Sequence, residues 1–471
     1  MTKKPIVYVD LDGTLSPSDV LLESCLLLLK KNIFYVFPML WWALQGGWVF
    51  KTQVARRIDP VLDFLPIDAT VLERLNQLKS AGHELVLASA SVRRDVQKVA
   101  TRLGLFDRVI ASDQINLKGA QKLLAIEADS KGEPFMYFGD AAVDVSVWRK
   151  ASVAFGVNTS MGTRTKAFAA GVSLNRIDSR RTGLKVWLKA MRLQQWAKNG
   201  LLFLPLFAAH ENDAALWLNM LLGFVAFGLV ASATYIWNDL MDLNSDRQHP
   251  RKRHRPMASG SLAISKAFLF MKLLGVLGFV TAYVAVGWQF TLVLIIYTVV
   301  TLLYTFVFKR TAFVDVLLLA MLYTVRVIAG GIGTGIELSS WLLAISLFVF
   351  LSLALVKRCA ELEFLQLEGS QPQGRGYRMS DLSYLVSMGI SSGFVAVLVL
   401  ALYVDSQNGS MLYSKPEFLW GICPLFLYWL MRIWIMTSRK EMIDDPVHFA
   451  IHDRISWGFV LAVAVMVFLA T

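Results

Sequence analysis

The sequence predicts two parts of different character: an α/β domain with a parallel, doubly wound sheet, then an all-α polytopic membrane domain of about nine transmembrane helices. Of the 471 residues, 55% are hydrophobic and 17% are charged, against roughly 45–50% and about 25% in soluble domains. Apolar runs of membrane-spanning length lie beyond about residue 200, whereas short apolar strands alternate with helical stretches before about residue 178. The net charge is +12, and at this hydrophobicity we expect an anionic membrane, not nucleic acid, as the partner of the basic residues.

The strands of the first part end in polar clusters. Apolar segments of strand length are 6–9, 84–89 and 135–140, with helical stretches at 70–81 and 93–103. Parallel strands carry their carboxyl ends to one edge of the sheet, where such sheets bind ligands. We therefore expect the residues at these ends to converge on one site: Asp10, Asp12, Ser89, Asp140 and Asp144.

Most of the apolar runs beyond residue 200 approach the roughly 20 residues that cross about 30 Å of hydrocarbon. Basic loops, such as 247–255 and 439–440, alternate with loops that carry almost no lysine or arginine. Since basic loops face the cytoplasm, we expect a multi-pass inner-membrane protein with its N-terminal domain and active sites on the cytoplasmic side, and its C-terminus outside. The expected spans are 200–210, 215–237, 264–286, 289–308, 312–332, 340–356, 384–404, 417–436 and 455–471.

Two further segments are expected to touch the membrane without crossing it. Residues 179–198 place Leu184, Trp187 and Leu188 at helical spacing among basic residues, which predicts an interfacial amphipathic linker helix. Residues 33–50 are apolar, but a single crossing there would separate Asp10 from the other strand ends. We expect a helical cap, within about residues 16–80, that dips into the cytoplasmic leaflet; the alternative is an ordinary buried cap helix.

The acids at the strand ends suit phosphate chemistry. Asp10 and Asp12 flank one residue directly after the first strand, which suits a nucleophile beside a general acid/base. Asp140 and Asp144 add hard oxygen ligands of the kind that Mg²⁺ prefers. The alternative is that these acids only cap turns and helices.

Four motifs, in order, resemble those of the haloacid dehalogenase-like (HAD) phosphohydrolase superfamily: DLDGT from Asp10, LASAS around Ser89, a lysine in NLKGAQK, and GDAAVD with Asp140. The resemblance covers residues 1–178 and implies a Rossmann-like phosphatase domain. It implies that Asp10 attacks a phosphate monoester, that Asp12 protonates the leaving oxygen, and that Ser89 and a lysine hold the phosphoryl group. Lys122 and Lys118 both remain candidates for that lysine, with Lys122 preferred. The implied Mg²⁺ ligands are Asp10, Asp12, Asp140 and Asp144.

A second acidic cluster, NDLMDLNSD, occupies residues 238–246. At about 100° per helical residue, Asp239, Asp242 and Asp246 share one narrow face, with Asn238 at its edge. Three close carboxylates at a membrane surface repel unless they share cations, which a Mg²⁺-bound diphosphate supplies. The alternative is a solvated acidic helix end.

This cluster resembles the NDxxDxxxD motif of the UbiA superfamily of intramembrane prenyltransferases, over about residues 185–471. Those enzymes carry a second motif, DxxxD, but here Leu319 stands where the second acid after Asp315 is expected, and Arg326 follows. Four segments are similar to the decaprenyl-phosphate phosphoribosyltransferase branch: MRLQQWAKN (191–199), YTFVFKRTAFVD (304–315), KRCAEL (357–362) and DDPVHFAIHDR (444–454). Members of that branch transfer 5-phosphoribose from phosphoribosyl diphosphate (PRPP) to a polyprenyl phosphate and release diphosphate.

That substrate pair requires phosphate binding more than proton transfer, since a lipid phosphate is already anionic. The resemblance makes Asp239 and Asp242 catalytic, with Asn238 and Asp246 completing the Mg²⁺ ligands. For the lone cations the alternative is a topology-setting or snorkelling role, whereas an arginine inside an apolar span is usually functional. The candidate substrate-binding residues are Lys198, Asn238, Arg247, Tyr304, Lys309, Asp315, Arg326, Lys357 and Arg358.

The fusion of the two domains suggests two steps. The transferase product would still carry a phosphate monoester, and the HAD domain would remove it to give polyprenyl-phosphoryl-ribose, a pentosyl donor for envelope glycans. The expected partners are PRPP, a polyprenyl phosphate and the membrane, with Mg²⁺ in both domains; the oligomeric state is not indicated. One alternative is a prenyltransferase acting on a prenyl diphosphate and an aromatic or other acceptor. Another is that the HAD domain only docks or regulates.

Overall fold

The computed structural model describes residues 4–113, 115–180, 183–367, 376–406, 413–442 and 445–471. The chain forms two compact units. The first unit contains residues 1–191 together with 235–271, and the second contains 192–234 and 272–471. The segment that follows the first long apolar helix therefore belongs with the N-terminal domain.

The first unit is built on a six-stranded sheet with the strand order β3-β2-β1-β4-β5-β6. Every pairing is parallel, which confirms the predicted doubly wound α/β class. The three predicted strands are present as β1, β2 and β4, and three more complete the sheet. The strands are β1 (Ile6–Val9), β2 (Leu85–Val92), β3 (Arg108–Ser112), β4 (Phe135–Gly139), β5 (Val153–Val157) and β6 (Leu174–Ile177).

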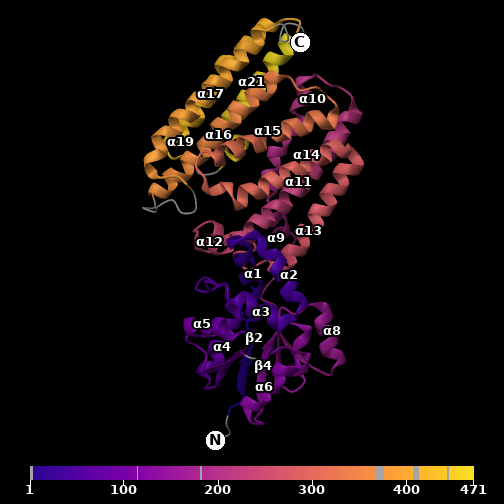
Figure 1. Ribbon diagram of the computed structural model, residues 1–471, viewed down its shortest axis with the longest axis vertical. Helices are drawn as coiled ribbons and strands as arrows, with labels where there is room; N and C mark the ends of the chain where they lie inside the picture. Colours follow the sequence, from indigo (N-terminus) through magenta and orange to yellow (C-terminus); the bar gives the residue numbers. More distant parts are fainter. Residues whose placement is uncertain (1–3, 114, 181–182, 368–375, 407–412, 443–444) are drawn as a thin grey trace. The chain divides into compact units, whose positions relative to one another are not determined.

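Helices cover both faces of this sheet (Figure 1). Because side chains alternate along a strand, Val7 and Val9 of β1 pack with α4 and α5, while Tyr8 packs on the other side with α6 and α7. The predicted helices at 70–81 and 93–103 are confirmed. The helices are α4 (Ala69–Ser80), α5 (Arg93–Leu103), α6 (Ala120–Ser130), η2 (Ala142–Asp144), α7 (Val145–Trp148) and α8 (Met161–Ala169).

A helical cap follows β1. It comprises α1 (Val20–Lys31), η1 (Ile33–Tyr35), α2 (Val36–Leu44) and α3 (Gly47–Ala55). The apolar stretch expected at 33–50 is broken at Gly46, whose φ of 116° favours glycine. Neither helix beside this break is long enough to span a bilayer. A buried cap helix does not describe α2, because its large apolar side chains are mostly exposed: Phe37 66%, Leu40 61%, Trp41 61% and Leu44 82%.

The linker between the two sequence halves is shorter than predicted. Helix α9 (Leu184–Met191) ends where Arg192 takes a φ of 52°, and a 3-10 helix, η3 (Leu193–Phe203), continues the chain to α10 (Leu204–Ala208). A helix is thus present over 184–191 and ends before residue 198, while its placement at the membrane interface stays a prediction. The ring of Trp187 lies edge-on to Phe270, 4.7 Å between centroids.

The apolar half is helical, as predicted, but its count of spans differs. Seven described helices are long and apolar enough to cross a membrane, and an eighth candidate is the pair α20 and α21, bent by 82°. The expected first span, 200–210, is the exception, because the 3-10 segment is followed by a helix of only five residues, α10, with Pro205 in its first turn. The remaining helices are α11 (Ala214–Met241), α12 (Leu243–Gln248), η4 (Lys252–His254), α13 (Ile264–Thr281), η5 (Ala282–Val286), α14 (Trp288–Phe306), η6 (Phe308–Arg310), α15 (Val314–Thr334), α16 (Ser340–Leu367), η7 (Met379–Asp381), α17 (Leu382–Asp405), η8 (Pro416–Gly421), α19 (Ile422–Ser438), α20 (Pro446–His452) and α21 (Arg454–Ala470).

Segment 193–208 nevertheless runs along α11 in the opposite direction. The indole of Trp196 donates a hydrogen bond to Ser232 (2.9 Å), and further on Phe203 stacks on Trp217 with centroids 5.8 Å apart. The contact point on α11 therefore moves backward as the segment advances. Although its helices are too short to count as a membrane span, this segment lies antiparallel to α11, which is long enough to cross a membrane.

Candidate functional sites

Three carboxylates meet at the carboxyl edge of the sheet. Asp10 follows β1, and Asp140 and Asp144 follow β4; one oxygen of each lies within 4.8 Å of the others. Gly13, with a φ of 82°, allows this approach, since a Cβ there would overlap the Asp140 carboxylate. The acids predicted to converge from two strands do so.

Lys122 neutralises part of this negative charge. Its ammonium lies 2.9 Å from the Asp10 carboxylate and 3.8 Å from that of Asp144, and it donates to the hydroxyl of Tyr137 (3.1 Å). Burial opposes its charge, but the carboxylates outweigh that effect and hold the pKa of Lys122 above its ordinary value. Of the two candidate lysines, Lys122 is the one that the structure brings to Asp10.

The carboxylate of Asp12 is not one of the three in this group. Its carboxylate accepts hydrogen bonds from the Val20 backbone N–H (2.8 Å), from Ser91 (2.5 Å) and, more distantly, from Ser89 (3.5 Å). The expectation that its carboxylate joins the metal ligands is therefore not met, because the N-terminus of α1 and the end of β2 hold its oxygens. Ser89 is buried and also accepts from the Ser91 N–H (3.1 Å).

Burial and mutual repulsion raise the pKa values of this site. Burial raises the pKa of Asp10 to about 6, with Lys122 opposing and Asp144 adding to the rise. Burial and Asp10 raise the pKa of Asp140 to about 8, and burial and Asp19 raise that of Asp12 to about 7. Buried carboxylates with raised pKa values gain most from a divalent cation. Asp10, Asp140 and Asp144 therefore fit Mg²⁺.

The second acidic cluster is not one continuous helix face. Helix α11 ends at Met241 and α12 begins at Leu243, so Asp242 is the N-cap between them. Asp239 and Asp246 stay together, because one guanidinium nitrogen of Arg255 binds both, at 3.0 and 2.7 Å. Asp242 instead pairs with Lys30 of α1 (3.0 Å). This break changes the predicted arrangement of three acids on one helix face. Asp239 and Asp246 share Arg255, whereas Asp242 pairs with Lys30.

The pair with Arg255 is the part of this cluster that fits a cation. Burial raises the pKa of Asp246 to about 6, with Arg255 opposing and Asp239 adding to the rise. A second cation would relieve the same repulsion. Asn238, one residue before Asp239, is half-buried on α11.

Arg247, predicted to bind a substrate phosphate, is occupied within the protein. Its guanidinium binds both oxygens of Glu23 on α1, at 2.9 and 2.7 Å, and each side chain is 3% exposed. It also donates to the carbonyl oxygen of Ala258 (3.3 Å). Arg247 therefore forms a buried ion pair in this structure, and its binding of a substrate phosphate stays a prediction.

In the second unit, Lys198 and Lys357 meet on one carboxylate. They lie 2.6 and 3.0 Å from Asp445, which is the N-cap of α20. Burial alone would raise the pKa of Asp445, but the two ammonium groups hold it well below its ordinary value. The hydroxyl of Tyr323 lies 3.5 Å from the same carboxylate. We call these residues the Asp445 cluster; in the DDPVHFAIHDR segment, residues 443–444 lie outside the described part.

Arg326 lies inside α15 and is 4% exposed. It donates to the side-chain oxygen of Asn199 (3.1 Å) and to the hydroxyl of Tyr297 (3.0 Å). Its guanidinium also lies over the ring of Tyr323, 5.8 Å from the centroid. This buried arginine therefore contacts neutral side chains and lies beside a tyrosine of the Asp445 cluster.

Asp315 and Arg358, both predicted to bind substrate, form a buried pair instead. Their charged groups are 2.6 Å apart, and both side chains are almost fully enclosed. The hydroxyl of Tyr377 also donates to Asp315. The two charges therefore pair inside the helical core, and their role in substrate binding stays a prediction. Tyr304 lies on α14 and Lys309 on η6, each half-buried.

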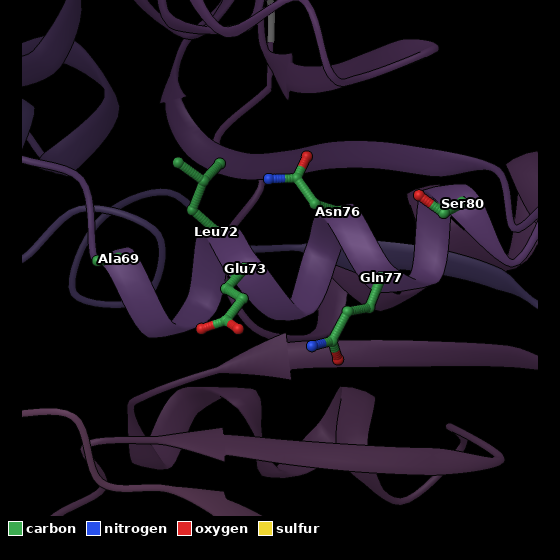
Figure 2. Close-up of a pocket in the computed structure, with 6 residues that line it drawn as sticks. All are labelled: Ala69, Leu72, Glu73, Asn76, Gln77 and Ser80. Carbon is green, nitrogen blue, oxygen red and sulfur yellow. The ribbon is translucent and has the colours of Figure 1, made fainter.

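A hollow along α4 is unrelated to these sites. Figure 2 shows its lining side chains, which all belong to that helix. None of them belongs to the carboxylate edge of the sheet, so the hollow has no part in the chemistry. Its lining residues are Ala69, Leu72, Glu73, Asn76, Gln77 and Ser80.

Sequence reasoning missed several partners of the predicted residues. Many of these partners lie far away in sequence, although Arg255 is only nine residues from Asp246 and Asp445 lies beside a proline in a recognised segment. The missed partners are Glu23, Lys30, Ser91, Tyr137, Asn199, Arg255, Tyr297, Tyr323, Tyr377 and Asp445.

The fold and these sites define a polytopic membrane protein with an N-terminal α/β domain of phosphohydrolase type. Residues 201–470 match the UbiA prenyltransferase family, and residues 45–151 match the haloacid dehalogenase-like hydrolases. The chain belongs to the UbiA prenyltransferase family and carries an N-terminal HAD hydrolase domain. These two domains indicate an enzyme, a membrane transferase with a hydrolase domain.

Three relatives show how the two domains are distributed. The uncharacterised protein y4nM of Sinorhizobium fredii is 34% identical over 97% of this chain and 89% of its own length. The nodulation protein NoeC of Azorhizobium caulinodans is 34% identical over 60% of this chain and 92% of its own. A decaprenyl-phosphate phosphoribosyltransferase of Mycobacterium tuberculosis is 32% identical over 57% of this chain and 88% of its own. The transferase is therefore related to the phosphoribosyltransferase.

Proposed function

We propose that the membrane domain transfers 5-phosphoribose from PRPP to a polyprenyl phosphate, and that the HAD domain then hydrolyses the 5-phosphate. The observation that carries this proposal is the Asp445 cluster, because two lysines beside a buried arginine suit phosphate-bearing substrates. Similarity to a decaprenyl-phosphate phosphoribosyltransferase over 88% of that enzyme supports the same substrate pair.

In the transfer, an oxygen of the lipid phosphate forms a bond to C1 of the ribose. The bond from C1 to the diphosphate oxygen breaks, and its electron pair leaves with the diphosphate. The attacking oxygen is already anionic, so the step needs no base. Lys198 and Lys357 bind a substrate phosphate by exchanging Asp445 for it, and Arg326 adds positive potential. Asp239 and Asp246, with Asn238 beside them, would hold Mg²⁺, which neutralises the diphosphate.

In the hydrolysis, a carboxylate oxygen of Asp10 attacks the phosphorus of the 5-phosphate. The bond between phosphorus and the ribose oxygen breaks, and Asp12 gives that oxygen a proton. Water then attacks the phosphorus, Asp12 takes the proton back, and inorganic phosphate leaves Asp10. A pKa of about 7 suits Asp12 to both transfers near neutral pH. Lys122 holds Asp10, and Asp10, Asp140 and Asp144 would hold Mg²⁺, which offsets the phosphate charge.

Access to a lipid-linked substrate is the role that we propose for the exposed cap. The apolar side chains of α2 suit the acyl region of a bilayer, and Lys30 and Lys31 close the preceding helix where anionic headgroups would lie. Basic loops favour the cytoplasmic side for this domain. Replacing Trp41 with Ser should slow hydrolysis of the lipid-linked phosphate several-fold, by the loss of buried apolar area, while leaving a soluble phosphomonoester unaffected. Equal losses on both substrates would contradict this role.

The decisive experiment uses full-length protein in detergent with Mg²⁺, PRPP and a polyprenyl phosphate. Diphosphate, inorganic phosphate and the mass of the lipid product are followed together. Wild type should release both, Asp239→Asn neither, and Asp10→Asn should accumulate the phosphorylated ribosyl lipid. If no ribosyl lipid forms and a prenyl diphosphate releases diphosphate instead, the enzyme is a prenyltransferase.

A further inference from the structure

Helix α1 of the hydrolase domain contacts the segment that carries the second acidic cluster. We call residues 242–263, from Asp242 to the residue before α13, the acidic loop after Asp242 and Asp246, although the basic residues of 247–255 also belong to it. Both contact points are described within the first unit. Glu23 binds Arg247, and in the last turn of α1 Lys30 binds Asp242. Two residues of one hydrolase helix thus hold two residues of the transferase motif region.

The Glu23–Arg247 pair is built as a fixed support. Both side chains are 3% exposed, and the guanidinium binds both carboxylate oxygens, the strongest geometry for such a pair. Ser18 donates to Glu23 and accepts from Arg247 (3.4 Å). Removing one partner of a buried pair leaves the other charge uncompensated, which makes the contact hard to open.

The backbone of the acidic loop also lies close to the hydrolase domain near this pair. Gly260 has a φ of 75°, and a Cβ at that position would overlap Pro17. Arg247 also bonds to the carbonyl of Ala258, so the same guanidinium closes the acidic loop onto itself. The loop is therefore fixed at both ends against residues 17–23 of the hydrolase domain.

We infer that Glu23 is a positioning residue of the transferase: through Arg247 it holds the acidic loop in the conformation that presents Asp246 beside Asp239. Arg247 directly follows Asp246, so a shift of Arg247 moves the acid that shares Arg255 with Asp239. The inference rests on the proposed function only where it is tested by the KM for PRPP. It assigns the hydrolase domain a structural part in transfer that is separate from its own chemistry.

The connection also reaches the hydrolase site. The carboxylate of Asp12 accepts from the N–H of Val20, the first residue of α1, and Asp19 caps the same helix through Leu22 (3.0 Å). Glu23 lies one turn further on. The helix that holds the acidic loop is therefore anchored at its other end by the proposed acid of the hydrolase.

The test is amide hydrogen exchange of the acidic loop in full-length protein, without substrate. In Glu23→Gln, exchange over 242–263 should accelerate by about tenfold or more, because the loop opens more often. Glu73→Gln, an exposed carboxylate on α4 of the same domain, is the matched control and should match wild type. Asp10→Asn, which spares α1, should also leave the exchange unchanged. Unchanged exchange in Glu23→Gln overturns the inference.

Kinetics provide the second readout. Glu23→Gln should raise the KM for PRPP about tenfold, while hydrolysis of a soluble phosphomonoester stays within about twofold of wild type. Glu23→Asp, which keeps the charge, should recover part of the loss. If Glu23→Gln does not fold, Ser18→Ala tests the same contact more gently and should show the same direction. A wild-type KM in a folded variant overturns the inference, whereas absence of PRPP turnover in wild type overturns the proposed function and leaves the exchange test decisive.

Discussion

The first unit contains two acidic clusters that are built in opposite ways. Asp10, Asp140 and Asp144 are gathered within 4.8 Å, and one lysine borders them. Asp239 and Asp246 are bridged by Arg255, while Asp242 is held aside by Lys30. The first cluster is preorganised for an added cation, whereas the second already holds cations of its own chain. A divalent ion has only to enter the first cluster, but it must exchange with a side chain in the second.

The largest expected effect breaks the gathered cluster. Asp10→Asn removes the nucleophile and should lower the hydrolysis of a soluble phosphomonoester by about 10³-fold or more. Single-turnover phosphate release measures this loss. Asp59→Asn, an exposed carboxylate of the same domain, should behave as wild type. A loss in Asp10→Asn below about tenfold would mean that another residue attacks the phosphorus.

The next effect concerns the bridged cluster. Asp239→Asn should slow diphosphate release by about 10²-fold, because it removes one of the two buried carboxylates that share a cation. The matched control is Asp213→Asn, an exposed carboxylate directly before the first residue of helix α11. Similar rates in the two variants would remove Asp239 from the reaction. Steady-state diphosphate release is the measurement.

A variant of Arg255 tests whether this arginine competes with Mg²⁺ in the second cluster. With Arg255→Gln, Asp239 and Asp246 lose their shared cation, so Mg²⁺ should bind them without competition. We expect Mg²⁺ to raise the Tm of this variant by a few degrees more than that of wild type, through binding to the folded state. Arg253→Gln, an exposed neighbour, is the control. An equal Mg²⁺ effect in all three proteins would show that Arg255 does not compete with the metal.

The smallest effect concerns the acid that is turned aside. The Lys30–Asp242 pair is partly exposed, at 34% and 22%, and such pairs contribute about 0–1 kcal/mol. Lys30→Gln should therefore change diphosphate release by no more than about threefold at physiological salt. A loss as large as that of Asp239→Asn would place Asp242 at the centre of the cluster.

The two clusters also differ in how well the sequence predicts them. The first follows from strand ends, because the carboxyl edge of a parallel sheet gathers residues whatever their separation in sequence. Its choice of Lys122 over Lys118 follows from the position of Lys122 inside α6. The second prediction assumed an unbroken helix, and the turn at Asp242 defeats that assumption.

Three other predicted site residues have buried partners that local sequence does not reveal. Arg247, Asp315 and Arg358 each look available in sequence, but each finds a buried partner of opposite charge: Glu23 for Arg247, and Asp315 and Arg358 for one another. Local spacing contains no information about such partners. The membrane half is predicted well where spans are long, and poorly at 193–208, where a 3-10 helix replaces an α-helix.

The length of helix α11 also determines how deep Asn238 and Asp239 lie in the membrane. Its 28 residues, at 1.5 Å each, measure about 42 Å, against roughly 30 Å of hydrocarbon. If its apolar N-terminal turns begin at one face of the bilayer, its last two turns stand clear of the acyl chains at the other. Asn238 and Asp239 occupy those turns. A hydrated cation can therefore reach these two residues without entering the hydrocarbon core. They would then lie at the depth of the lipid phosphate groups.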